Sequence, residues 1–207
     1  MTKKKIVARG AEAVLYSETY EGADAISKER VEKAYRQKEI DSELRKDRTK
    51  RESRLLEEAS RIGVPVPKLM KMDVESARII MEDIKGSKLK DSIGQMTPEE
   101  QKRLFRILGK EVAKLHSKGI VHGDLTTSNV LIRAGSLVII DFGLGSFTSR
   151  IEDMAMDLIL LKDVLRSSHP EIDVWNSFIE GYSFGKKEMV LNRLKEVEKR
   201  GRYTDKS

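Results

Sequence analysis

Cysteine is absent from this 207-residue sequence, and histidine occurs only three times, at His116, His122 and His169. A chain without cysteine has no disulfide scaffold, no thiolate zinc site and no cysteine nucleophile. Three histidines argue against a multi-histidine metal cage. The composition therefore excludes thiol chemistry, points away from zinc and fits a reducing compartment.

Long hydrophobic runs are also missing. No stretch approaches the roughly 18 apolar residues that a membrane helix needs, and no apolar segment of a signal peptide follows the basic residues 1–5. We therefore expect a cytoplasmic protein without a membrane partner. The 40 basic residues exceed the 34 acidic ones by six, a surplus that permits contact with nucleic acid or acidic proteins without requiring it.

The first third of the chain alternates strands with one helix. Apolar runs bounded by turn residues predict four strands, at 14–16, 25–27, 68–74 and 78–81. Glu21-Gly22 predicts a hairpin turn between the first two. The charged stretch 41–62 carries apolar residues on one helical face and ends at Gly63.

The rest of the chain is mostly helical. Thr97, Pro98 and Glu100 form a helix start with a capping box, and Gly119 ends that helix. Two apolar runs, at 130–132 and 137–140, predict a hairpin. Three more helices are predicted at 154–165, 172–182 and 187–197. The fold class is therefore α+β, with a sheet-and-helix lobe at 1–84 and a reduced helical lobe at 85–207. Ligand sites favour the cleft between such lobes.

The strongest chemical signal is the stretch from His122-Gly123-Asp124 to Asn129, followed twelve residues later by Asp141-Phe142-Gly143. Asp124 suits the carboxylate that orients an attacking hydroxyl, and the oxygens of Asn129 and Asp141 suit magnesium. Each residue alone could be structural, since Asp124 could cap a turn and Asn129 could begin a strand. Their joint spacing is that of a protein-kinase catalytic loop.

A lysine on a strand completes this chemistry. Lys28 ends the run 25–27 and could reach the α- and β-phosphates of a nucleotide. A solvated surface lysine is the ordinary alternative. The following helix offers Glu52 as its partner, with Glu57 and Glu58 as competitors further along. We favour Glu52.

Two further segments are candidate nucleotide contacts. Gly10, Ala11 and Glu12 occupy the place of a phosphate-covering loop, and Val14 could cover one face of the adenine. This loop is poor in glycine. The backbone groups of Glu82 and Ile84, at the end of the last strand of the first lobe, could bind adenine.

With these residues in place, the sequence resembles the small atypical kinases of the PRPK family, the kinase subunit of the KEOPS (EKC) complex. Matching stretches include 10–13, 48–52, 122–129, 141–144, 152–158 and the tail Arg200-Gly201-Arg202. The resemblance implies a minimal bilobal protein-kinase-like fold that binds ATP and Mg²⁺, phosphorylates serine or threonine, and hydrolyses ATP in support of tRNA threonylcarbamoyladenosine (t6A) modification. It implies Lys28 and Glu52 as the ion pair, Asp124 as catalytic base, and Asn129 and Asp141 as metal ligands.

The same resemblance implies partners and leaves alternatives open. The direct partner would be the threonylcarbamoyl-transferase subunit, alongside other KEOPS subunits. The basic region Arg45 to Arg54 and the C-terminal tail could contact tRNA, although a solvated helix face is the commoner reason for a charge run. His122-Gly123-Asp124-Leu125 also occurs in RIO-type kinases of ribosome maturation and resembles small-molecule phosphotransferases. A nucleotide-binding scaffold without catalysis is the third alternative.

Overall fold

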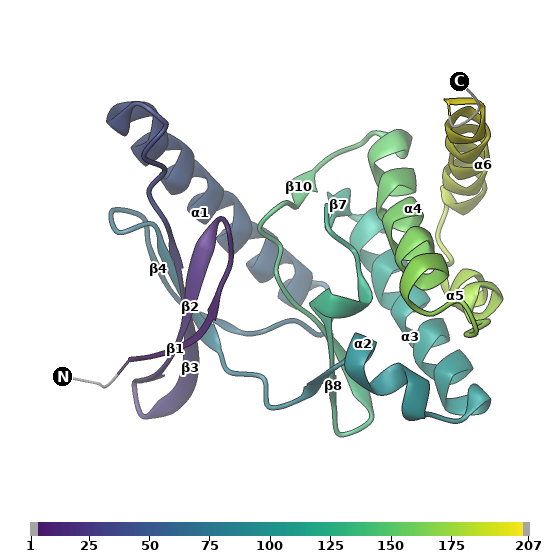
Figure 1. The fold of residues 1–207 in the computed structure, drawn as a ribbon, viewed down its shortest axis with the longest axis horizontal. Helices are drawn as coiled ribbons and strands as arrows, with labels where there is room; N and C mark the ends of the chain where they lie inside the picture. The colour runs from purple at the N-terminus through teal and green to yellow at the C-terminus, as the bar shows by residue number, and fades with distance from the viewer. Residues whose placement is uncertain (1–3, 205–207) are drawn as a thin grey trace.

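The computed structural model describes residues 4–204, and the side chains of residues 4–200. A five-stranded antiparallel sheet lies at one end of the molecule and a group of helices at the other (Figure 1). The sheet has the order β1-β2-β3-β5-β4, and its strands are β1 (Lys5–Arg9), β2 (Ala13–Tyr20), β3 (Ala23–Arg30), β4 (Leu69–Asp73) and β5 (Arg78–Glu82).

The β2–β3 hairpin forms as its turn residues predict. Glu21 and Gly22 both have positive φ angles, of 49° and 82°, which suit a two-residue hairpin turn. The register places Leu15 opposite Lys28. Strand β1 was not predicted, because it is exposed along its whole length and carries no alternation of buried and exposed residues.

Helix α1 (Lys38–Arg61) is the only helix between the strands of this sheet. It confirms the helix expected at 41–62 and begins three residues earlier. Leu55, Leu56 and Ala59 are buried on its inner face. Gly63, with φ of 74°, ends the helix by a left-handed turn, as expected.

The helical part contains α2 (Leu89–Ser92), α3 (Pro98–Ser117), α4 (Ile151–Ser168), α5 (Trp175–Gly181) and α6 (Lys187–Thr204). The capping box of α3 is present, because Thr97 Oγ1 accepts from the Glu100 N–H and Glu100 Oε2 accepts from the Thr97 N–H at 2.9 Å. Helices α3 and α5 pack closely. A Cβ atom on Gly109 would lie 2.1 Å from the Phe178 carbonyl, so this crossing requires glycine.

Two small sheets of short strands lie in the helical part. β6 (Ser87–Lys88) pairs with β8 (Val130–Arg133), which forms the predicted hairpin with β9 (Ser136–Ile139). β7 (Ile120–Val121) pairs with β10 (Ser146–Phe147). One apolar cluster extends from Leu55 of α1 to Leu158 of α4, so the inner end of α1 and the helices share a core. Among residues 4–204 there is no helix long and apolar enough to cross a membrane.

Candidate functional site

The segment from Ile120 to Asn129 begins the site, and a buried carboxylate holds it in place. Asp157 of α4 accepts the backbone N–H groups of His122 at 2.6 Å and of Gly123 at 2.7 Å. His116 Nε2 lies 3.2 Å from the same carboxylate, and His116 Nδ1 lies 2.6 Å from the Tyr182 hydroxyl. Burial, followed by the nearby charge of Asp157, raises the pKa of Tyr182 well above its ordinary value.

His122 braces this segment from inside. Its Nδ1 accepts the backbone N–H of Asp124 at 3.2 Å. The ring proton is therefore on Nε2, which donates to the Ile140 carbonyl at 2.9 Å. The ring thus joins the residue before Asp141 to the loop that carries Asp124.

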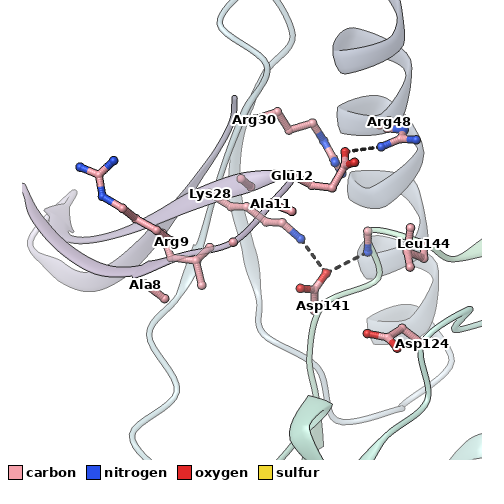
Figure 2. Close-up of a pocket in the computed structure, with 14 residues that line it drawn as sticks. Ala8, Arg9, Ala11, Glu12, Lys28, Arg30, Arg48, Asp124, Asp141 and Leu144 are labelled. Atoms are coloured by element: carbon pink, nitrogen blue, oxygen red, sulfur yellow. Dashed lines mark hydrogen bonds and ion pairs between the residues drawn. The ribbon is translucent and has the colours of Figure 1, made fainter. Parts of the chain in front are cut away.

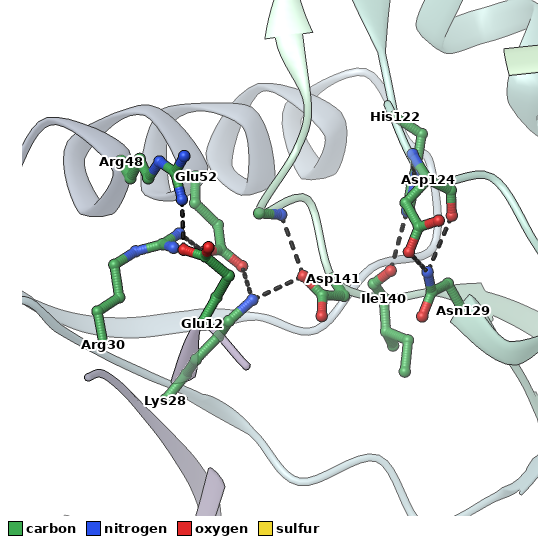
Figure 3. A network of polar contacts seen from close by, with 11 residues as sticks. Glu12, Lys28, Arg30, Arg48, Glu52, His122, Asp124, Asn129, Ile140 and Asp141 are labelled. Carbon is green, nitrogen blue, oxygen red and sulfur yellow. Dashed lines mark hydrogen bonds and ion pairs between the residues drawn. The ribbon is translucent and has the colours of Figure 1, made fainter. Parts of the chain in front are cut away.

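Asp124 and Asn129 contact each other directly across their five-residue spacing (Figure 3). The Asn129 amide donates from Nδ2 to the Asp124 carbonyl at 2.9 Å and to Asp124 Oδ2 at 2.8 Å. Both contacts use the nitrogen of the amide, so Asn129 Oδ1 remains free to meet a cation. The 3₁₀ turn at Thr127–Asn129 produces this return of the chain.

Asp141 has a φ angle of 63°, in the left-handed region that a non-glycine residue seldom adopts. Such strain concentrates at functional sites. Its Oδ1 accepts from Lys28 Nζ at 2.6 Å and from the Gly143 N–H at 3.1 Å. Burial acts to raise the pKa of Asp141, but the charge of Lys28 and the hydrogen bonds from Lys28 and Gly143 together outweigh it, and the pKa is lowered below its ordinary value.

Lys28 connects the sheet to α1 and to Asp141. Its Nζ donates to Glu52 Oε1 at 2.7 Å, and Arg30 contacts the second oxygen of the same carboxylate. Burial acts to lower the pKa of Lys28, but Glu52 and then Asp141 outweigh it, so the pKa is raised and the amine is charged. Of the three candidate glutamates, Glu52 is the one that the structure brings to Lys28, and Glu57 is exposed.

Two adjoining cavities share Lys28, Asp141 and Leu15 in their walls. One, of about 450 Å³, is lined by Met81, Glu82, Asp83 and Ile84 on one side and by Asn129 and Leu131 on the other. The second, of about 340 Å³, is lined by the loop between β1 and β2 together with Arg30, Arg48, Asp124 and Gly143 (Figure 2). The polar groups of both lobes therefore meet along one continuous cleft.

The proposed nucleotide contacts lie along this cleft with one exception. Gly10, Ala11 and Glu12 line the smaller cavity, and Glu82 and Ile84 line the larger one. The Glu82 N–H already donates to the Lys68 carbonyl at 2.9 Å, so Glu82 could contact a nucleobase only through its carbonyl.

The exception is Val14, which lines neither cavity. Its neighbour Leu15 lines both, because successive residues of a strand point to opposite faces of the sheet. The apolar wall expected from Val14 is therefore supplied by Leu15. The run Val14-Leu15-Tyr16 is apolar throughout, so its sequence does not indicate which residue faces the cleft.

Three residues of the site were not singled out from the sequence. Arg30 and Arg48 contact the carboxylates of Glu52 and Glu12, and Asp157 holds the backbone of His122 and Gly123. Asp157 could have been found, because it is a charged residue on the apolar face of α4, beside Met154 and Leu158. A buried carboxylate in such a place needs hydrogen-bond donors.

The donor set fits a magnesium ion held jointly with a phosphate. Asn129 Oδ1 and the second oxygen of Asp141 are hard donors of the kind that Mg²⁺ prefers. In the part of the chain that the structure describes, no three His, Asp or Glu side chains gather into a metal site of their own. A cation here would therefore need oxygens from a bound ligand.

Comparison with known proteins identifies the family. A family model for the RIO domain matches residues 15–164. The KEOPS complex subunit Bud32 of Pyrococcus abyssi is 40% identical, and the match covers 98% of each chain. A probable bifunctional tRNA threonylcarbamoyladenosine biosynthesis protein of Methanothermobacter thermautotrophicus is 41% identical over 97% of this chain. The match covers only 37% of that bifunctional protein.

Solved structures agree on the fold. The Rio2 kinase from Chaetomium thermophilum matches with a TM-score of 0.66 at 16% identity, over 98% of this chain and 73% of that one. WaaP in complex with acyl carrier protein matches with a TM-score of 0.63 at 16% identity, over 98% and 89% of the two chains. The fold is thus the minimal bilobal kinase-like fold, and the chain belongs to the RIO-domain family and, within it, to the Bud32 (PRPK) family of KEOPS subunits that its motifs resemble.

Proposed function

We propose that this chain is a Mg²⁺- and ATP-dependent phosphotransferase that also hydrolyses ATP. The observation that carries the proposal is the convergence of Lys28, Asp124 and Asp141 on the smaller cavity, from three separate stretches of the chain. A scaffold would not need a carboxylate at Asp124 facing the space beside Lys28. Phosphoryl transfer depends on positioning and charge, and this cavity supplies both.

Each group has a role in this proposal. Lys28, held by Glu52, binds the α- and β-phosphates, and Asn129 and Asp141 hold Mg²⁺. Asp124 accepts the proton of the attacking hydroxyl or water. The loop 10–12 covers the phosphates, and Glu82 and Ile84 bind the adenine. Residues 1–84 form the nucleotide-binding lobe and residues 85–207 the catalytic lobe.

We further propose that the chain acts in the cytoplasm as the kinase and ATPase subunit of a KEOPS-type complex, in support of t6A modification. The names of the Pyrococcus and Methanothermobacter relatives support this assignment. Its direct partner would be the threonylcarbamoyl-transferase subunit, and its phosphate acceptors would be serine or threonine. The RIO-domain match supports the shared chemistry of RIO-type kinases, while the Bud32 subunit of Pyrococcus abyssi is matched over 98% of its length.

Contact with tRNA through the region Arg45 to Arg54 is part of the proposal. The exposed side chains of Lys50, Arg51 and Arg54 line a groove of about 600 Å³ between α1 and Phe147 of β10. Phosphate groups would be attracted to this positive surface. Of the C-terminal tail, helix α6 extends to Thr204, whereas the side chains after Arg200 and the whole of residues 205–207 lie outside the described residues.

Single-turnover ATP hydrolysis in Mg²⁺ tests the catalytic proposal. We expect Asp124→Ala to lower the rate at least about a hundredfold, because it removes the group that orients the nucleophile. Asp163→Ala, an exposed carboxylate on α4, serves as the control and should hydrolyse ATP at the wild-type rate. Equal rates for wild type and Asp124→Ala would support the scaffold alternative instead.

A further inference from the structure

The loop that covers the smaller cavity carries a carboxylate where phosphates are expected. Glu12 lines this cavity together with Lys28 and Asp141. A free carboxylate beside the phosphate site would repel an anionic ligand. The loop therefore needs a contact that keeps the charge of Glu12 away from the nucleotide.

In the structure, Arg48 contacts the Glu12 carboxylate. Its Nη1 contacts Glu12 Oε2 in an ion pair that joins α1 to the loop (Figures 2 and 3). The Arg48 side chain is 26% exposed and that of Glu12 is 47% exposed. The pair thus lies at the edge of the cavity, where water only partly screens it.

Other contacts fix the backbone of the loop but do not neutralise Glu12. The Gly10 N–H donates to the Ala13 carbonyl at 2.9 Å, and the Val31 N–H donates to the Glu12 carbonyl at 3.1 Å. Lys33 Nζ donates to the Ala11 carbonyl. The backbone is therefore already folded into a tight turn, and the side chain of Glu12 depends on Arg48 for its direction.

The ion pairs around the cavity fall into two groups, one of Lys28 and Arg30 with Glu52 and Asp141, and one of Arg48 with Glu12. Three cations, Lys28, Arg30 and Arg48, face three carboxylates. The carboxylates that they contact are Glu12, Glu52 and Asp141. Arg48 and Glu52 lie one helical turn apart on α1, so the same helix holds the loop and Lys28. Loss of Arg48 would leave an uncompensated negative charge beside the phosphate site.

We infer that Arg48 is a positioning residue that holds the Glu12 carboxylate out of the phosphate site, and so makes this glycine-poor loop compatible with an anionic nucleotide. The inference rests on the proposed function. Arg48 acts only through Glu12 and does not need to touch the ligand. Removing Arg48 should therefore weaken binding of phosphates, and removing the charge of Glu12 as well should restore it.

Calorimetric titration of the full chain in Mg²⁺ with a non-hydrolysable ATP analogue tests this. We expect Arg48→Ala to weaken binding about three- to tenfold. Arg48→Lys should bind nearly as the wild type does, and the double variant Arg48→Ala with Glu12→Gln should recover to within about twofold. Lys46→Ala is the matched control, because it removes an α1 ion pair to Glu75 on the surface, and it should bind as the wild type does.

Adenosine provides the second measurement, because it lacks phosphates. Its affinity should be the same for Arg48→Ala and for the wild type, whereas a general loosening of the loop would weaken adenosine as well. Equal analogue affinity in wild type and Arg48→Ala, or no recovery in the double variant, would overturn the inference. A wild-type chain that binds neither ligand would overturn the proposed function itself.

Discussion

The Asp157 carboxylate reaches the backbone of Gly123 at 2.7 Å, and this contact ties α4 to the residue directly before Asp124. The second oxygen of Asp157 accepts the N–H of His122 at 2.6 Å. The same carboxylate thus satisfies two consecutive backbone donors in a buried place. The position of Asp124 is consequently set from a helix that begins 27 residues later.

Replacement of Asp157 by alanine should unfold the chain more easily and slow ATP turnover. Two buried N–H groups would lose their acceptor, at a cost of about 1–3 kcal/mol each. Urea unfolding measures the stability. Asp163→Ala on the same helix, where the carboxylate is exposed, should change it by less than about 0.5 kcal/mol. A stable Asp157→Ala chain would show that other contacts hold the loop.

Gly123 should tolerate no side chain. Its φ is 77°, and an added Cβ would lie 2.2 Å from the Leu144 carbonyl. Gly22 has a similar φ of 82° with nothing within 4 Å, so Gly22→Ala measures the backbone strain alone, about 1 kcal/mol. Gly123→Ala should cost about 1–3 kcal/mol more than Gly22→Ala in urea unfolding. Equal costs would mean that the loop moves aside freely.

The capping box of α3 should make stability depend on acid pH. Hydrogen bonds from the Thr97 backbone and then from its hydroxyl hold the pKa of Glu100 below its ordinary value of 4.5. A lowered pKa stabilises the fold above pH 4.5, and this contribution is lost as the pH falls through the lowered value. The stability difference between wild type and Glu100→Ala should therefore be constant from pH 6 to about 8 and shrink at about pH 3.

Urea unfolding at these pH values checks the capping-box prediction. Glu99→Ala is the matched control, because Glu99 lies in the same first turn of α3 and is exposed. A difference between wild type and Glu100→Ala that stays the same at pH 3 would contradict the link between the cap and the charge of Glu100.

Neutralising the groove on α1 should weaken binding of RNA in a salt-dependent way. The triple variant Lys50→Ala, Arg51→Ala and Arg54→Ala should bind tRNA more weakly. Its plot of log affinity against log salt should be shallower by about one unit for each phosphate that the variant no longer neutralises. A triple variant on α3, at Lys102, Arg103 and Lys110, removes the same charge elsewhere and should keep the wild-type slope. Equal slopes for the wild type and both triple variants would contradict the proposed binding of tRNA in this groove.

The elements predicted from the sequence are those with strong local signals. Glu21-Gly22 and Thr97 through Glu100 marked a turn and a helix start that the structure contains. The two-residue strands β6, β7 and β10 could not be predicted, because each forms only when a distant partner lies beside it. Strand β1 could not be predicted for a related reason, since an exposed edge strand has no buried face.

The candidate site was predictable where the spacing of polar residues is distinctive. The five-residue spacing from Asp124 to Asn129 and the position of Asp141 indicated which groups would meet. The contact of Arg48 with Glu12 was not predictable, because it depends on tertiary packing. For Asp157 the sequence indicates a buried carboxylate that needs donors, but it does not indicate that Gly123 supplies one of them. Leu15 was missed because all three residues from Val14 to Tyr16 are apolar and the strand face is decided by pairing with β3.

The pairing of β10 with β7 fixes the chain a few residues after Asp141-Phe142-Gly143. Ser146 and Phe147 follow Phe142-Gly143 by only a few residues and pair with Val121 and Ile120, directly ahead of the catalytic loop. The chain that follows Asp141 is thus joined by backbone pairing to the chain that precedes Asp124. The backbones of both segments therefore constrain the distance between the Asp124 and Asp141 carboxylates, in addition to the side-chain contacts of the site.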